Sequence, residues 1–326
     1  MIEIEDSDIK IYANRIGKPV RSQLSKMALM QECDDMHIRI MPNAGIGYNS
    51  INGFTGILNG VIRPELCGTD IGCGVLLYNL GKIEVDVFVL QRHLANYVPV
   101  GGEIHARNME CLSADCLKFE KSVRNILKKR HRLFSAIEEE YILRSLGTLG
   151  GGNHFVEIDI DQNSGENYLL VHTGSRRFGK LVMEKIIQTI QFFSSREDAE
   201  TVIDEAYGAV YEDCVEMAIL NRKTIAHIVC DFLNVTPQSG IDVVHNYAGA
   251  ISRKGAISAE KDEPGVILLG EGHGALLCLG KGNVEWNISA PSGIKSGMKI
   301  GEFINLIRPT VHIQKIISPI FTYRAM

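Results

Sequence analysis

Residues 63–80, RPELCGTDIGCGVLLYNL, combine a glycine-rich turn with an apolar run that is typical of a buried strand. Asp70 and Cys73 lie three residues apart in this turn, beside Gly72 and Gly74, which let the backbone approach a ligand closely. A carboxylate and a thiolate at this spacing can bind one divalent cation, and the sulfur can bridge two. The alternative is a small buried cysteine beside a turn-forming aspartate, since free cysteines are among the most buried residues.

Length and composition are those of an ordinary globular protein. The chain has 326 residues, of which 45% are hydrophobic and 22% charged, and its formal net charge is −5. We expect a single domain, 1–326, because no linker, repeat or low-complexity tract divides the chain. A net acidic protein does not bind nucleic acid over its whole surface, so phosphate binding has to be concentrated at a few basic side chains or metal ions.

Neither a signal-peptide pattern nor an apolar run of roughly 18 residues, the length that crosses a bilayer, is present in the sequence. The eight cysteines are scattered and form no C-x-x-C pair, which is typical of reduced thiols. We therefore expect a cytoplasmic protein that has no membrane partner.

Hydrophobic periodicity predicts both strands and helices. Residues 36–41 alternate as a strand does, and the polar segment 41–54 predicts a loop. The stretch 116–143 predicts a long amphipathic helix with a basic face, which is either solvated surface or a contact for an RNA backbone. Two further helices and a strand-rich region broken by glycine turns are expected at 177–194, 197–232 and 253–299.

Three apolar runs are each followed or preceded by a histidine beside a glycine or asparagine. His154 lies where the loop SLGTLGGGNH (145–154) enters a strand, His172 ends the strand YLLVH, and His245 ends IDVVH. Alone, each is more often a hydrogen-bonded core histidine than a ligand. One carboxylate, one thiolate and three imidazoles, however, suit two first-row divalent cations with the sulfur between them. We therefore predict a metal centre at Asp70, Cys73, His154, His172 and His245.

Six segments together resemble the RtcB family of RNA ligases and occur in the family's order. They are GTDIGCG (68–74), LGTLGGGNHFVEI (146–158), HTGSRRFG (172–179), HNY (245–247), RKGAIS (253–258) and GKGN (280–283). The resemblance implies a mixed α/β (α+β) class, with an RtcB-like fold of mixed sheets and flanking helices around a central metal site. It also implies two Mn²⁺ ions, GTP as cofactor, and RNA as partner, with 3′-phosphate or 2′,3′-cyclic phosphate ends joined to 5′-hydroxyl ends through a guanylylated histidine.

The resemblance assigns roles to particular residues. The five predicted ligands match the family's metal ligands, Asn153 matches a phosphate-contacting asparagine, and Glu157 matches an acidic residue of the guanylate pocket. Zn²⁺ is an alternative metal, because it outcompetes Mn²⁺ at most sites that combine thiolate and imidazole ligands.

The sequence departs from the family pattern around the guanylylation site. Ser292 occupies the position of the guanylylated histidine, and a serine hydroxyl is a weaker nucleophile than imidazole unless a base activates it. Glu271 places a carboxylate in the family's Gly-Ser-Met-Gly turn, and Arg324 aligns with a lysine near the family's C-terminus, so both are expected beside the nucleotide. His273, two residues past Glu271, is a candidate for a displaced nucleophile.

Three functions are compatible with this pattern. The first is an RNA ligase that uses an altered nucleophile. The second is a metal-dependent phosphoesterase that opens a 2′,3′-cyclic phosphate with a metal-bound hydroxide, and the third is a non-catalytic protein that binds RNA ends. We favour an RtcB-like, manganese-dependent enzyme that joins or processes RNA ends, and the sequence predicts no oligomeric state.

Overall fold

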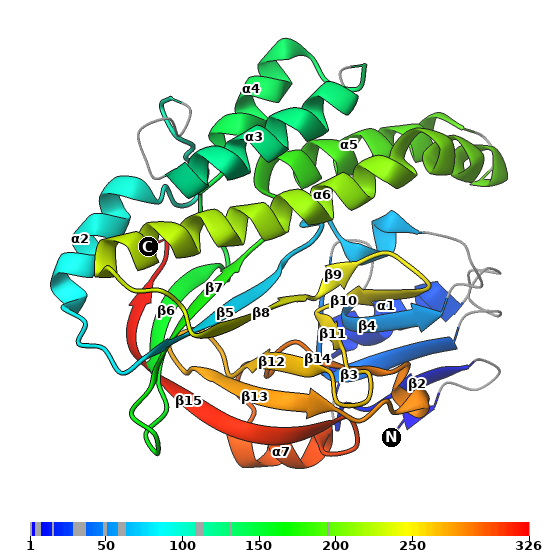
Figure 1. Cartoon of the computed structure of the whole chain (residues 1–326). Coiled ribbons are helices and arrows are strands. Elements are labelled where there is room, and N and C mark those ends of the chain that lie inside the picture. The colour runs from blue at the N-terminus through cyan, green and yellow to red at the C-terminus, as the bar shows by residue number, and fades with distance from the viewer. Residues whose placement is uncertain are drawn as a thin grey trace. The chain divides into compact units, whose positions relative to one another are not determined.

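The computed structural model describes residues 2–3, 8–14, 16–28, 37–47, 51–57, 63–107, 114–130, 132–193 and 196–325. Helices and strands both contribute to the fold (Figure 1), so the predicted mixed α/β class is confirmed. The chain forms two compact units, and the expectation of one domain stays a prediction. Unit one comprises Met1–Thr69 and Val243–Ile316, and unit two comprises Asp70–Asp242 and Ile317–Met326.

Unit one contains a six-stranded sheet with the strand order β1-β2-β3-β4-β10-β9. β3 pairs in parallel with β2 and antiparallel with β4. The core of this sheet includes Ile38 and Ile40 from β3 and Phe54 from β4, and Leu24 of the helix α1 packs with them. The elements are β1 (Ile2–Glu3), β2 (Ile9–Ile11), α1 (Lys18–Ala28), β3 (His37–Gly45), β4 (Asn52–Ile57), η2 (Pro64–Cys67), β9 (Asn246–Tyr247) and β10 (Ile251–Lys254).

The remainder of unit one is a short ladder, a hairpin and a helix. β11 pairs with β14, and β12 pairs with β13 through a glycine-containing turn, as expected for the strand-rich region. Ile267, Leu276 and Phe303 form a core between the hairpin and α7, a helix that sequence analysis did not predict. The elements are β11 (Ala256–Ser258), β12 (Pro264–Leu268), β13 (Ala275–Gly280), η3 (Val284–Trp286), β14 (Ser289–Pro291) and α7 (Ile300–Ile307).

Unit two carries strands in the order β15-β6-β7-β5-β8, with helices packed on them. All seven residues of β7 are buried, because it pairs antiparallel with both β5 and β6 and is covered by α6. α3 and α5 pack in turn on α6, the long helix in Figure 1. The elements are β5 (Gly74–Gly81), α2 (Val87–Tyr97), α3 (Ala114–Lys129), α4 (Ala136–Arg144), β6 (Phe155–Ile160), β7 (Asn167–Thr173), α5 (Arg176–Phe192), α6 (Arg196–Leu233), β8 (Ser239–Val244) and β15 (Val311–Tyr323).

Two predicted elements are wrong in their extent. The single helix over 116–143 is two helices, because Ser135 and Glu138 form a capping box that starts α4 afresh. The loop over 41–54 is shorter than predicted, since β3 continues to Gly45 with Met41 to Ala44 buried. No described helix is both long enough and apolar enough to cross a membrane.

The basic face of α3 is partly neutralised within unit two. Lys118 pairs with Asp115, Arg124 pairs with Glu120, and Arg130 pairs with Asp213 of α6. This pairing favours solvated surface over an RNA contact, because pairs within the fold reduce the positive charge that a phosphate backbone would meet.

Candidate metal centre

The glycine-rich turn that contains Asp70 and Cys73 lies directly before β5. The backbone N–H of Cys73 donates to the carbonyl oxygen of Asp70 over 3.2 Å, which closes the turn. Gly72 has a φ of 72°, and a Cβ there would lie 2.9 Å from both the Cβ of Ala218 and the Cα of Val215 on α6. Only glycine fits this position without a shift, because the turn lies directly against the helix.

Four of the five predicted ligands converge in unit two. The sulfur of Cys73 lies 3.4 Å from Nε2 of His154 and 3.5 Å from Nε2 of His172. Nε2 of His154 lies 2.9 Å from Oδ2 of Asp70, and the donor atoms of Asp70, Cys73 and His154 all lie within 4.8 Å of one another. The sulfur therefore lies next to the Nε2 atoms of both imidazoles, which is the position of a bridging ligand.

Strand pairing explains why these side chains meet. His172 of β7 is directly opposite Val75 of β5 and Phe155 of β6. Cys73 comes two residues before Val75, and His154 comes one residue before Phe155, so both lie at the same end of the three strands as His172. Glycine-rich turns at this end then bring the side chains toward one another.

The ring orientation of His154 is fixed by its surroundings. Its Nδ1 lies 3.0 Å from the carbonyl oxygen of Leu149, which also accepts the hydroxyl of Thr173 over 2.7 Å. A carbonyl oxygen only accepts, so Nδ1 carries a proton, and Nε2 is the ring nitrogen that faces Asp70 and Cys73. This outer hydrogen bond is the arrangement that typically orients metal-binding histidines.

The electrostatics of the centre favour a cation. Burial raises the pKa of Asp70, but the hydrogen bond and charge of His154 lower it more, so this pKa lies well below its usual range. Burial and the negative charge of Asp70 raise the pKa of Cys73 well above its usual range. A divalent cation would allow both groups to be ionised side by side, because it stabilises the thiolate. The donor set of oxygen, sulfur and imidazole nitrogen suits a first-row divalent metal.

Solvent reaches the centre at one side. The side chain of Asp70 is 33% exposed, whereas that of His154 is only 6% exposed. Gly174 has no side chain where a Cβ would lie 2.2 Å from Oδ1 of Asp70, so the carboxylate fits directly against the backbone after β7. A small ligand or ion can therefore approach the carboxylate while the imidazoles and the thiol stay buried.

The fifth predicted ligand, His245, belongs to unit one. It lies between β8 and β9 along the chain, and its side chain is buried. Its carbonyl oxygen accepts the backbone N–H of Gly255 over 2.8 Å. Its role as a metal ligand stays a prediction.

Three of the expected nucleotide-binding residues lie in unit two. Glu157 is fully buried on β6, and its Oε1 accepts the hydroxyl of Thr322 on β15 over 3.0 Å. Asn153 is exposed at the end of the loop before β6, and Arg324 is exposed after β15. Their contact with a nucleotide stays a prediction.

The other expected residues around the guanylylation site lie in unit one. Ser292 follows β14 and is half-buried, and its N–H donates to the carbonyl oxygen of Gly255 over 3.1 Å. Glu271 and His273 lie in the turn between β12 and β13, where Nδ1 of the exposed His273 donates to the carbonyl oxygen of Glu271 over 2.7 Å. An exposed imidazole is accessible to a nucleotide, whereas its role as nucleophile stays a prediction.

Three buried polar residues of unit two lie outside every predicted site. Asn221 and Arg222 are fully buried on α6, and their adjacency in a largely apolar helical stretch was the available signal. Asp159 is fully buried on β6, and neither carboxylate oxygen has a hydrogen-bond partner among the described residues. Burial and the nearby Glu157 raise the pKa of Asp159 to about 8. The alternation of β6 places both carboxylates on the same face of the sheet.

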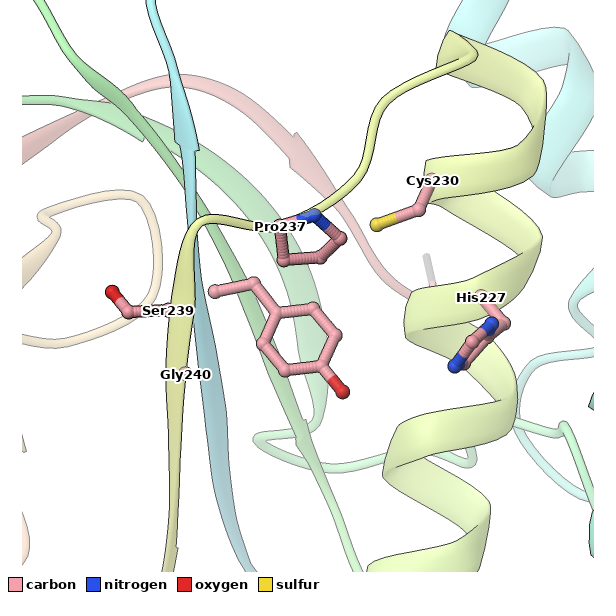
Figure 2. Close-up of a pocket in the computed structure, with 6 residues that line it drawn as sticks. His227, Cys230, Pro237, Ser239 and Gly240 are labelled. Atoms are coloured by element: carbon pink, nitrogen blue, oxygen red, sulfur yellow. The ribbon is translucent and has the colours of Figure 1, made fainter.

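A cavity of about 310 Å³ also occurs in unit two, between α6 and the segment that leads into β8 (Figure 2). His227 and Cys230 project into it from α6, and Pro237 forms the opposite wall. Burial raises the pKa of Cys230 to about 12, so this thiol is not ionised near neutral pH. None of the predicted metal or nucleotide residues lines this cavity.

Comparison with known proteins identifies the family. A family model described as tRNA-splicing ligase RtcB matches residues 23–294. RNA-splicing ligase RtcB of Escherichia coli (strain K12) is 26% identical over 96% of this chain and 88% of its own length. tRNA-splicing ligase RtcB of Pyrobaculum aerophilum is 27% identical over 66% of this chain and 56% of its own length. Because the family model spans most of the sequence and the convergent side chains lie within the matched range, this chain belongs to the RtcB family of ligases.

Proposed function

We propose that this chain is a metal-dependent RNA ligase that joins 3′-phosphate or 2′,3′-cyclic phosphate ends to 5′-hydroxyl ends. The observation that carries the proposal is the thiol of Cys73 within 3.5 Å of two imidazole Nε2 atoms, with Asp70 beside one of them. The names of its relatives, which are RNA-splicing and tRNA-splicing ligases, support RNA as the substrate.

The metal centre would hold two divalent cations. Asp70, Cys73 and His154 would bind one, while Cys73 and His172 would bind the other together with His245. Bound cations neutralise the charge that develops on a reacting phosphate and lower the pKa of a bound hydroxyl group. The resemblance favours Mn²⁺, and the mixed sulfur and nitrogen donors also suit Zn²⁺.

A guanine nucleotide would be the second cofactor. The buried carboxylate of Glu157, which the hydroxyl of Thr322 orients, would accept hydrogen bonds from N–H groups of the guanine ring. The exposed amide of Asn153 and the guanidinium of Arg324 would contact phosphate groups. The proposal places Glu271 near the nucleotide, where its negative charge would oppose a third phosphate.

The nucleophile would be His273, because Ser292 replaces the family's guanylylated histidine. A ring nitrogen of His273 would attack the α-phosphorus of GTP, forming a P–N bond while the bond to pyrophosphate breaks. Water would first open a 2′,3′-cyclic phosphate to a 3′-phosphate. An oxygen of the RNA 3′-phosphate would then attack the guanylate phosphorus, forming a P–O–P bond while the P–N bond breaks and the imidazole is regenerated, which activates the phosphorus of the RNA 3′-phosphate. The RNA 5′-hydroxyl would then attack that phosphorus, forming the new phosphodiester and releasing GMP.

Ser292 also favours a second candidate function. Without a guanylylated side chain, the same metal centre would hydrolyse a 2′,3′-cyclic phosphate by adding water across one P–O bond, which leaves a linear phosphate and a free hydroxyl. This reaction consumes no GTP and forms no RNA–RNA bond, so the products distinguish it from ligation.

One incubation tests both functions. The protein is mixed with Mn²⁺, GTP labelled at the α-phosphate, and two oligonucleotides, one with a 2′,3′-cyclic phosphate end and one with a 5′-hydroxyl end. Ligation predicts a longer RNA and a protein that carries the label, and the substitution His273→Ala is expected to abolish this labelling. The phosphoesterase predicts a linear phosphate end without a labelled protein.

Matched cysteine variants assign either activity to the centre. Cys73→Ser is expected to abolish the activity, whereas Cys116→Ser, which changes another buried cysteine of unit two on α3, is expected to retain it. Binding of RNA ends without any change in them would contradict both catalytic functions and favour the non-catalytic alternative.

A further inference from the structure

We infer that Asn221 and Arg222 of α6 are positioning residues that hold three ligand-bearing segments of unit two in place for metal binding. The inference rests on the metal centre proposed above. Both side chains are fully buried, and their hydrogen bonds go to backbone groups beside the ligands or in the loop that orients them. Neither residue was among those that the sequence motifs assigned.

Arg222 joins the segments that carry Cys73 and His172. Its Nη1 donates to the carbonyl oxygen of Gly72 over 2.8 Å and to the carbonyl oxygen of Thr173 over 2.8 Å. Gly72 immediately precedes Cys73 in the chain, and Thr173 immediately follows His172. One planar guanidinium thus fixes the backbone next to both ligands, and the spacing of the sulfur and the imidazole depends on it.

Asp242 fixes the guanidinium itself. Nε of Arg222 lies 3.1 Å and 3.0 Å from the two carboxylate oxygens of Asp242, and Nη2 lies 2.6 Å from Oδ1. This paired geometry neutralises a fully buried positive charge and sets the plane of the guanidinium. Arg222 therefore has a single orientation, with Nη1 aimed at the two carbonyl oxygens.

Asn221 holds the segment that orients His154. Its Oδ1 accepts the N–H of Gly147 over 2.7 Å, and its Nδ2 donates to the carbonyl oxygens of Thr148 over 3.1 Å and Gly174 over 3.2 Å. Thr148 directly precedes Leu149, whose carbonyl oxygen accepts the Nδ1 proton of His154. Asn221 therefore acts on the imidazole through the position of one carbonyl oxygen.

The same face of α6 supports the turn that carries Cys73. Ala218 contacts the turn at Gly72, and residues 218, 221 and 222 are spaced three and four apart, which places them on one face of the helix. A purely structural role would be met at least as well by apolar side chains, since replacing a buried ion pair with apolar groups is often neutral or stabilising. A positioning role explains why the hydrogen bonds of Asn221 and Arg222 go to backbone groups beside the ligands.

Metal affinity tests the inference on the full chain. Apo-protein is titrated with Co²⁺, whose thiolate charge-transfer and d–d bands report coordination by Cys73 and the histidines. Arg222→Met and Asn221→Leu are expected to weaken Co²⁺ binding by roughly 10- to 100-fold and to alter the bands, the loss typical when an outer partner of a ligand is removed. Arg222→Lys keeps the charge without the fork of donors, and it is expected to recover only part of the affinity.

The control is Arg130→Met. This variant also loses an arginine–aspartate ion pair, the one between Arg130, which follows α3, and Asp213 of α6. This control is expected to bind Co²⁺ like the wild type. The melting temperature of each variant without metal shows whether the variants are equally stable. If Arg222→Met does not fold, Arg222→Lys is used in its place. Wild-type affinity and spectra in both Arg222→Lys and Asn221→Leu would overturn the inference.

Hydrogen exchange separates this inference from the metal centre itself. The amides of Cys73 and Gly147 are expected to exchange faster in the Arg222 and Asn221 variants, respectively, than in Arg130→Met. If the wild type binds no Co²⁺, the proposed metal centre is wrong, and the exchange rates still decide whether these side chains hold the segments. Unchanged exchange would contradict the positioning role.

Discussion

The imidazole of His154 is held by the carbonyl oxygen of Leu149, which lies 3.0 Å from Nδ1 and leaves Nε2 facing the sulfur of Cys73 at 3.4 Å. Nε2 is therefore the nitrogen that faces the metal centre. Because the geometry exists without a bound ion, little reorganisation is needed on binding.

His154→Ala is expected to reduce Co²⁺ affinity by more than the roughly 100-fold that loss of an outer partner causes, because it removes a direct donor. The measurement is a competition titration against a chelator of known affinity. His227→Ala is the matched control, since His227 lies in the same unit and lines the cavity of Figure 2. Equal affinities for the two variants would exclude His154 as a ligand.

Gly72→Ala is expected to lower the free energy of unfolding by about 2–4 kcal/mol, since a Cβ adds both left-handed strain and a clash with α6. Denaturant unfolding measures this change. Gly101→Ala is the control, because Gly101 has a φ of 63° but a Cβ there would have no neighbour within 4 Å. The Gly101→Ala variant is expected to lose only the free energy of unfolding that corresponds to left-handed strain, about 1–2 kcal/mol. Equal losses would show that contact with α6 contributes nothing.

Asp159 is expected to make stability fall as pH rises. Its pKa is raised from 3.8 to about 8 in the folded state, so the folded protein binds the proton more tightly than the unfolded chain. The stabilising contribution is complete below pH 3.8, and it is lost progressively as pH rises through about 8. Asp159→Asn is expected to be more stable than the wild type above pH 8, by up to about 5 kcal/mol.

Urea unfolding at pH 5 and pH 9 measures this difference. The exposed Asp262→Asn is the control and is expected to have the same pH dependence as the wild type. An Asp159→Asn protein that loses as much stability as the wild type between the two pH values would contradict the raised pKa.

Removal of metal is expected to lower thermal stability. A ligand at 100 times its dissociation constant adds about 2.7 kcal/mol to the free energy of unfolding, and chelation with EDTA removes this contribution. Melting curves with Mn²⁺ and with EDTA are therefore expected to differ for the wild type and for Cys116→Ser. They are expected to coincide for Cys73→Ser, and a persistent difference in that variant would place the stabilising ion elsewhere.

Much of the centre could be predicted from local sequence, because each ligand lies next to an apolar strand and a glycine-rich turn. Asp70, Cys73, His154 and His172 come together as expected. Which strands pair and in what register depends on contacts between distant segments, so spacing alone did not give the distances. The extent of β3 was missed for the same reason, since burial of its polar segment comes from the surrounding sheet.

The positioning residues were harder to predict than the ligands. In sequence, Asn221 and Arg222 are two polar residues in a largely apolar stretch of a long helix, and only the packing of α6 on β5 and β7 shows that they are buried. The strand β15 was missed as well, although its apolar residues alternate with polar ones, because Pro319 argues against a strand interior. Its pairing with β6 accommodates Pro319 next to a shift in register between Pro319 and Phe321.

The chain passes between the two units at 69/70, 242/243 and 316/317, so neither unit is a continuous stretch of polypeptide. During translation, the helical layer of unit two emerges long before β15, and the outer edge of β6 stays without its neighbour until residues 318–323 have been synthesised. An unpaired strand edge is a template for association with other chains. Loss of residues 318–323 is therefore expected to leave the edge of β6 open to association with other chains.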